Sequence, residues 1–230
     1  MTSDPKILAL AFVAGIIPSL LWLWFWLKED KKNPEPKGLL AAVFIMGIIA
    51  VIFVLPIQKF IQAQIVSPVS RIVLWASAEE IMKYLAVLVV LYKTNQIDEP
   101  LDWPIYLITA ALGFAALENA LFLIKPLTTL TTTVSFLTGE LRFLGSTLLH
   151  TVSSGILGIG LGISFHMRKF MRKLYLVVGL LLAIALHSVF NFFIIEVNGS
   201  GFLGVLRVFA FLWVVTIIVM LLFEKVRRMS

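Results

Sequence analysis

The chain has 230 residues, of which 60% are hydrophobic and 14% are charged, whereas a soluble domain is closer to half apolar and a quarter charged. It contains no cysteine, which excludes disulfides, thiolate catalysis and cysteine-ligated zinc. The net charge of +6 comes from basic residues in short segments beside long apolar runs, which favours a topology signal in a membrane protein over nucleic-acid binding.

Long apolar runs tile the chain, and each can cross the hydrocarbon core, which takes about 20 helical residues. In chain order, the predicted spans cover residues 7–27, 38–57, 69–92, 103–124, 140–165, 174–195 and 202–223. The first run is too long for the apolar core of a signal peptide, and its lysines follow rather than precede it, so we expect an uncleaved anchor. The sequence therefore predicts an all-α, polytopic transmembrane helix bundle of about seven spans, forming one integral membrane domain over residues 1–230.

The segment 57–66 (IQKFIQAQIV) follows the second predicted span. Its apolar side chains at 57, 60, 61 and 65 have helical spacing. Two interpretations remain open: a helix lying flat in the membrane interface, or an extension of the third span.

Basic residues gather on one side of the predicted bundle. Twelve lysines and arginines flank spans on that side and three on the opposite side. Because short cytoplasmic loops carry an excess of basic residues, we expect the N-terminus outside and the C-terminus in the cytoplasm.

Several polar residues lie inside predicted spans, where a charged side chain costs roughly 2.5–3.5 kcal/mol on insertion scales. They are Glu79, Glu80, Lys83, Glu118, His150, His187 and Asn191. With a helical rise of about 1.5 Å per residue, most of them fall about 7 to 16 Å from the outer end of their span. Four spans, at about 69–92, 103–124, 140–165 and 174–195, thus bring polar groups to a common layer in the outer half of the bilayer. This convergence predicts a functional site.

The spacing within the spans indicates which groups could act together. Lys83 follows Glu79 by four residues and Glu80 by three, so one lysine can neutralise either carboxylate. His187 and Asn191 are four apart and share a helix face. A carboxylate in an apolar pocket suits a general acid or base near neutral pH, and an asparagine or a neutral histidine can donate to an oxyanion. These groups predict hydrolysis of a peptide bond by activated water, without a covalent nucleophile.

A metal-dependent version of this chemistry stays open. Two histidines and a carboxylate are a common catalytic zinc set, and His150, His187 and Glu118 are the candidate ligands. The histidines come from separate spans, however, and the sequence has no His-Glu-x-x-His. These residues indicate no cofactor other than a divalent metal such as zinc.

Four short motifs together resemble the PrsW-type intramembrane proteases. Residues 79–83 (EEIMK) resemble their Glu-Glu-x-x-Lys motif, and residues 114–119 (FAALEN) resemble an aromatic residue followed by Glu-Asn. His150, with Arg142 upstream, resembles the third motif, and residues 187–191 (HSVFN) resemble the final His-x-x-x-Asn. The order of the motifs fits as well, and they cover the chain from the third to the sixth span.

The resemblance implies an intramembrane endopeptidase. Its catalytic residues would be Glu79, Glu80, Glu118, His150, His187 and Asn191, supported by Lys83, Asn119 and Arg142. In this scheme Glu80 or Glu79 is the general base, His150 assists, and His187 with Asn191 stabilises the oxyanion. The resemblance further implies a membrane-anchored protein substrate, such as an anti-sigma factor cut on its outer side, and a location in the bacterial plasma membrane.

The PrsW-type proteases are similar to the type II CAAX prenyl endopeptidases and the bacterial CPBP proteins. In that group a histidine stands where this chain has Glu118, and the first motif ends in an arginine one residue beyond the position of Lys83. These departures favour the PrsW branch. They also leave open which histidine does the work.

Other interpretations of the same residues remain. Glu79, Glu80 and Lys83 could form a structural ion pair, and intramembrane carboxylates and histidines also occur in proton- or cation-coupled transporters. A non-enzymatic membrane scaffold is a third possibility. The two serines and four glycines of residues 153–162 are interpreted as a stripe for close helix packing.

Overall fold

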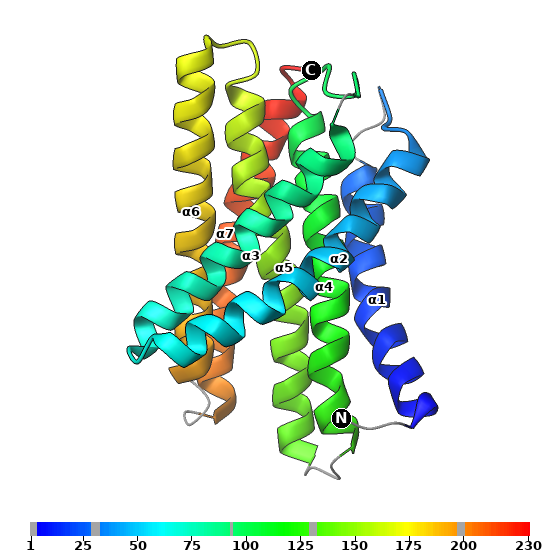
Figure 1. The fold of residues 1–230 in the computed structure, drawn as a ribbon, viewed down its shortest axis with the longest axis vertical. Helices are drawn as coiled ribbons and strands as arrows, with labels where there is room; N and C mark the ends of the chain where they lie inside the picture. Colours follow the sequence, from blue (N-terminus) through cyan, green and yellow to red (C-terminus); the bar gives the residue numbers. More distant parts are fainter. Residues whose placement is uncertain (1–3, 29–32, 93, 129–132, 197–200) are drawn as a thin grey trace.

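The computed structural model describes residues 4–28, 33–92, 94–128, 133–196 and 201–230, with the side chains of 125–144, 195–203 and 205 outside this description. Over the described residues the chain forms seven α-helices and no strand. They are α1 (Pro5–Leu27), α2 (Lys37–Gln64), α3 (Pro68–Leu91), α4 (Asp102–Thr128), α5 (Thr133–Ile163), α6 (Lys169–Glu196) and α7 (Gly201–Arg227). The helices run along one another as a bundle (Figure 1), which confirms the predicted all-α fold.

Six of the seven helices in the described part are long and apolar enough to cross a membrane. α3 is the exception, because Glu79, Glu80 and Lys83 fall together in its middle. It packs against α2, α4 and α6 and so belongs to the same bundle. The two ends of the chain lie at opposite ends of the bundle (Figure 1), as an odd number of crossings requires, whereas the side of the membrane on which each lies stays a prediction.

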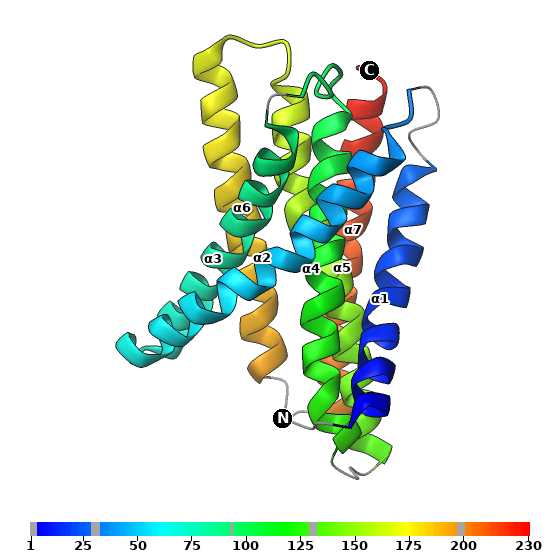
Figure 2. The ribbon, with the colours of Figure 1, turned by 45° about the vertical axis from the view of Figure 1, so that its right-hand side comes forward.

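α2 differs most from its predicted span. It continues through Pro56 to Gln64, and the backbone becomes extended at Ile65 before α3 begins at Pro68. Most of the segment 57–66 is therefore the end of α2, so the interpretation as an extension of the third span is wrong. Figure 2 shows this end of α2 and the start of α3 leaving the other helices together, as a hairpin at the lower left.

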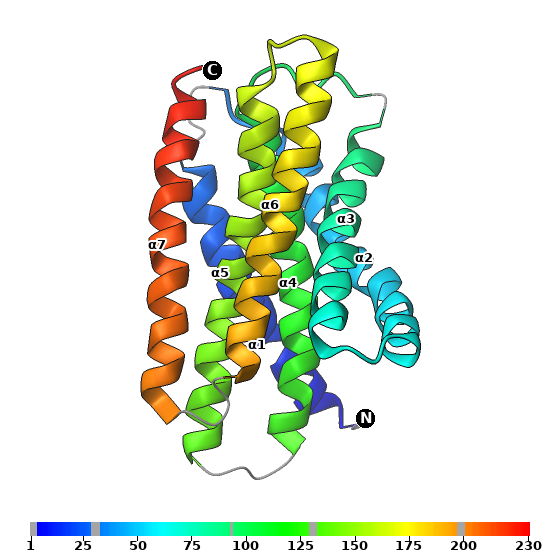
Figure 3. The ribbon, with the colours of Figure 1, turned by 90° about the vertical axis from the view of Figure 1, so that its left-hand side faces the viewer.

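α4 lies at the centre of the bundle. It packs most extensively against α5, α1 and α2, and the run from Pro104 to Ala116 is buried on every face. A helix that is apolar all round needs such a central place. Figure 3 shows α4 and α5 enclosed between α7 on one side and α2 with α3 on the other, with α6 in front.

α2 and α4 approach each other closely through two glycines. A Cβ added at Gly47 would meet the backbone of Ala110, and one added at Gly113 would meet the backbone of Phe44. Small residues at such crossings let the helix backbones pack closely in a membrane. This contact fixes the first part of α2 against the core, while its last part leaves the bundle.

Gly113→Ala is expected to lower the stability of the fold by about 1–3 kcal/mol, the usual cost of overpacking, because backbone atoms cannot move aside as a flexible side chain would. The measurement is thermal unfolding of the purified protein in detergent. Gly38→Ala is the matched control, since no atom lies within 4 Å of a Cβ added there. Equal unfolding midpoints for the two variants would contradict the prediction.

Candidate active site

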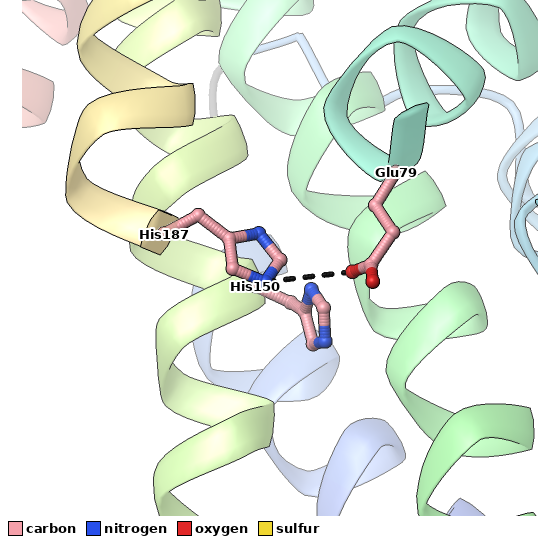
Figure 4. A group of neighbouring side chains, drawn as sticks. All are labelled: Glu79, His150 and His187. Atoms are coloured by element: carbon pink, nitrogen blue, oxygen red, sulfur yellow. Dashed lines mark ion pairs between the residues drawn. The ribbon is translucent and has the colours of Figure 1, made fainter. Parts of the chain in front are cut away.

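A cluster of polar side chains lies where α3, α4, α5 and α6 meet. Figure 4 shows its centre, in which Glu79 of α3, His150 of α5 and His187 of α6 point toward one another. Glu80 and Lys83 of α3 join it, and all five residues are buried. Residues separated by more than one hundred positions in the sequence thus form one constellation inside the bundle.

Glu80 is the most heavily hydrogen-bonded member of the cluster. Its carboxylate accepts from Lys83 Nζ at 2.5 Å, His187 Nδ1 at 2.7 Å, and the hydroxyls of Ser153 and Ser154 at 3.0 Å each. A carboxylate only accepts, so Nδ1 of His187 carries a proton, and in the neutral ring Nε2 then has a free lone pair. With four donors on its two oxygens, Glu80 is suited to hold other groups in place rather than to take a proton.

His150 is held between a cation and an anion. Lys83 Nζ lies 2.9 Å from its Nδ1, and Glu118 Oε2 lies 2.6 Å from its Nε2. Because lysine only donates and a carboxylate only accepts, Nε2 carries the proton and Nδ1 is the acceptor. Phe114 packs against the ring with the centroids 5.3 Å apart. Glu118 is therefore the partner of His150, and its side chain is 20% exposed.

Glu79 has one oxygen held and one oxygen without a hydrogen bond. Gln58 Nε2 donates to Oε1 at 2.7 Å. Oε2 is buried and has no hydrogen-bond partner among the described residues, although it faces Nε2 of His187 at 3.4 Å. With the ring of His187 neutral, both facing atoms carry lone pairs, so the two side chains can share a proton or a cation between them.

The cluster has more negative than positive charge. Among the described side chains, three carboxylates, of Glu79, Glu80 and Glu118, lie around a single lysine, Lys83. With the carboxylates ionised and both histidines neutral, these groups together carry a formal charge of −2. An uncompensated charge of this kind is costly in a buried site, so the cluster is chemically complete only with protons or a cation added.

The other residues singled out in the sequence lie outside these contacts. Asn119 is buried and donates to Thr147 at 2.8 Å, which ties α4 to α5. Asn191 lies one turn beyond His187 and is half-buried; no hydrogen bond joins its side chain to another residue within the described ranges. Arg142 is on α5, but its side chain lies outside the described residues.

Three residues of the cluster have no place in the sequence-based set of candidates. Ser153 and Ser154 belong to the predicted packing stripe, yet both hydroxyls donate to Glu80. Their positions, three and four residues after His150 on the same helix, were the available signal. Gln58 lies in segment 57–66, for which the sequence leaves an interfacial helix and an extension of the third span open, and nothing in its surroundings in the sequence indicates a contact with Glu79.

Comparison with known proteins identifies the family. Residues 35–222 match the model of a family described as PrsW family intramembrane metalloprotease. This range contains every residue of the cluster. The chain belongs to the PrsW family.

Proteins named Protease PrsW are similar to this chain over most of its length. The one from Oceanobacillus iheyensis is 30% identical over 212 residues, covering 89% of this chain and 91% of the relative. The one from Geobacillus kaustophilus is 27% identical over 206 residues, covering 87% and 86%. No solved structure matches the chain.

Membership of the PrsW family makes the protein an enzyme, an intramembrane protease. With its apolar helices, the chain is an integral membrane protein whose substrate is a membrane protein. The family assignment favours proteolysis over the transporter and scaffold interpretations of the same polar residues.

The PrsW-family description as a metalloprotease can be tested against the side chains. One ligand atom from each of Glu79, His150 and His187 lies within 4.8 Å of the others. Tetrahedral zinc with bonds of about 2.0–2.2 Å keeps neighbouring ligand atoms about 3.4 Å apart, and Glu79 Oε2 and His187 Nε2 are 3.4 Å apart. The buried Oε2 of Glu79, which has no hydrogen bond within the described part of the chain, the facing nitrogen of His187 and the excess of carboxylates in the cluster all fit a divalent cation.

The ligand set differs from the sequence-based candidates in its carboxylate. Glu118 was expected to join the two histidines, whereas the group that the structure brings together contains Glu79. Glu118 is instead hydrogen-bonded to Nε2 of His150. His150 has both nitrogens engaged, by Glu118 and by Lys83, so it can bind a metal only by giving up one of these partners.

Proposed function

We propose that this PrsW-family protease is a metal-dependent endopeptidase that cuts a membrane-anchored protein, with Glu79, His187 and His150 as the ligands of a divalent metal. The observation that carries the proposal is the buried Oε2 of Glu79, which has no hydrogen-bond partner among the described residues and faces His187 Nε2 at 3.4 Å. A bound divalent metal such as zinc would act as a Lewis acid and favour the deprotonated form of water near neutral pH.

The remaining residues of the cluster would orient these ligands. Glu80 accepts from Nδ1 of His187, which fixes the tautomer and the direction of the ring, as carboxylates commonly do for metal-binding histidines. Ser153 and Ser154 hold Glu80 in place, and Lys83 balances its charge. Glu80 therefore acts through His187 in this scheme and is not the general base.

Glu118 is the carboxylate best placed to exchange a proton during the reaction. Its side chain is 20% exposed, compared with 4% for Glu79 and 0% for Glu80, and it contacts Nε2 of His150 at 2.6 Å. A general base needs access to the attacking water, and a general acid needs access to the leaving amine. Asn191, one turn beyond His187, would supply an amide donor near the developing oxyanion.

The test is cleavage of a membrane-tethered peptide by the purified protein in proteoliposomes. Removal of metal with a chelator is expected to abolish cleavage, and Zn²⁺ is expected to restore it. Glu80→Ala and His187→Ala should be inactive, whereas Glu224→Gln, a change in the helix end near the C-terminus, should cleave like the wild type. Full activity in a metal-free preparation, or full activity of folded His187→Ala, would overturn the proposal.

The substrate and the orientation in the membrane belong to the same proposal. The excess of basic residues on one side supports an outside N-terminus and, with it, a site in the outer half of the bilayer. The bacterial relatives named Protease PrsW support residence in the bacterial plasma membrane. A membrane-anchored anti-sigma factor cut on its outer side fits that depth. In the same assay, peptides with the cut site near the outer surface should be cleaved faster than peptides cut near the inner surface.

A further inference from the structure

Gln58 contacts the site from a helix that carries none of the four motifs. It lies two residues beyond Pro56, in the part of α2 that leaves the bundle. Its side-chain amide donates to Oε1 of Glu79 at 2.7 Å. Among the described residues it is the partner that engages this oxygen.

Gln58 is itself held by α3 at two points. Its backbone carbonyl accepts from the indole Nε1 of Trp75 at 3.1 Å, while its side chain reaches Glu79. Trp75 and Glu79 are four residues apart and so lie on the same face of α3. One face of α3 thus binds both the backbone carbonyl and the side-chain amide of Gln58, which fixes the amide in one orientation.

Without this contact, Glu79 has a competing partner. Lys83 lies four residues along the same helix and carries the cluster's only positive charge in the described part, so the carboxylate of Glu79 could turn toward it. A donor on Oε1 from the opposite helix keeps the carboxylate facing α6. The other oxygen, Oε2, then points at His187 Nε2.

We propose that Gln58 is a positioning residue of the protease: it holds one oxygen of Glu79 so that the other remains available, beside His187, as a metal ligand. This inference rests on the proposed function, because it assigns Gln58 to the metal site described there. Gln58 acts through Glu79 and touches neither metal nor substrate.

The test compares Gln58→Leu with Gln62→Leu, a matched change one turn further along the same exposed end of α2. Co²⁺ alone is titrated into each metal-free protein, and its absorption bands give the Kd. Gln58→Leu is expected to bind Co²⁺ about 10- to 100-fold more weakly, the usual effect of losing a residue that orients a ligand. Its kcat should fall while KM for the peptide stays unchanged, and Gln62→Leu should match the wild type in all three.

The outcomes separate the two proposals. A wild-type Kd and kcat in Gln58→Leu, together with loss of Co²⁺ binding in Glu79→Gln, would overturn the role of Gln58 and leave the metal site standing. Wild-type protein that cleaves without metal and binds no Co²⁺ would overturn both. If Gln58→Leu has a lowered unfolding temperature, Gln58→Met, which keeps an unbranched side chain without the amide, is measured in its place.

Discussion

Glu79→Gln is expected to abolish proteolysis, lowering kcat by about 10³-fold or more, within the range for removal of an acid–base or charge-stabilising group. The amide has the shape of the carboxylate, and its oxygen can still accept from Gln58, so the fold should be retained. What is lost is the negative charge and the free anionic oxygen beside His187. The measurement is single-turnover cleavage of the tethered peptide, with Co²⁺ binding recorded on the same preparation.

Two comparisons sharpen this prediction. Glu118→Gln should also lower kcat, but it should weaken Co²⁺ binding less than Glu79→Gln does, because Glu118 contacts a nitrogen of His150 and is not itself a proposed ligand. Glu224→Gln should change neither quantity. Substantial cleavage by folded Glu79→Gln would show that Glu79 is not a ligand, and would return the choice of the working carboxylate to Glu80 or Glu118.

Lys83→Met is expected to lower stability by about 3–5 kcal/mol, the usual cost of removing one partner of a buried ion pair. Lys83 Nζ and Glu80 Oε1 lie 2.5 Å apart and both side chains are buried, so the variant leaves the carboxylate of Glu80 buried without its cation. It also removes the donor to His150 Nδ1. The measurement is denaturant unfolding in detergent micelles, followed through tryptophan fluorescence.

The double variant Glu80→Gln/Lys83→Met distinguishes stability from catalysis. Removing both charges should recover much of the stability lost in Lys83→Met, since no unpaired charge remains. Activity should stay low, because a glutamine is a weaker acceptor for His187 Nδ1 than a carboxylate. Strictly additive losses of stability in the double-mutant cycle would contradict a direct interaction between the two side chains.

The sequence predicts the helices of this protein, because an apolar run of about 20 residues has few alternatives to a helix in a membrane. It predicts less well where each helix ends. α2 passes through Pro56 and continues to Gln64, although a proline usually ends or kinks a helix. Whether a helix continues beyond its apolar stretch depends on what it packs against, here Trp75 of α3, and no local pattern shows that neighbour.

The polar members of the site are also visible in the sequence, since a glutamate or histidine within an apolar span is costly and rare. The division of roles is not visible. Glu79 and Glu80 are adjacent and chemically identical, and they differ only in what surrounds them: two serines, a histidine and a lysine on Glu80, and a single amide on Glu79. These contacts come from four helices, so they depend on packing that spacing along one helix cannot reveal.

The charged residues that form the site also make α3 harder to insert into the membrane. Of the seven described helices, α3 is the one that is not apolar enough to qualify as a span. Each charged residue at the centre of an inserting segment adds about 2.5–3.5 kcal/mol to its apparent insertion free energy, and α3 carries three together. Its apolar neighbour α2 is synthesised first and packs against it in the finished bundle. We therefore expect α2 and α3 to insert into the membrane together. Insertion of α3, which carries the glutamates of the site, would then depend on α2, the helix synthesised just before it.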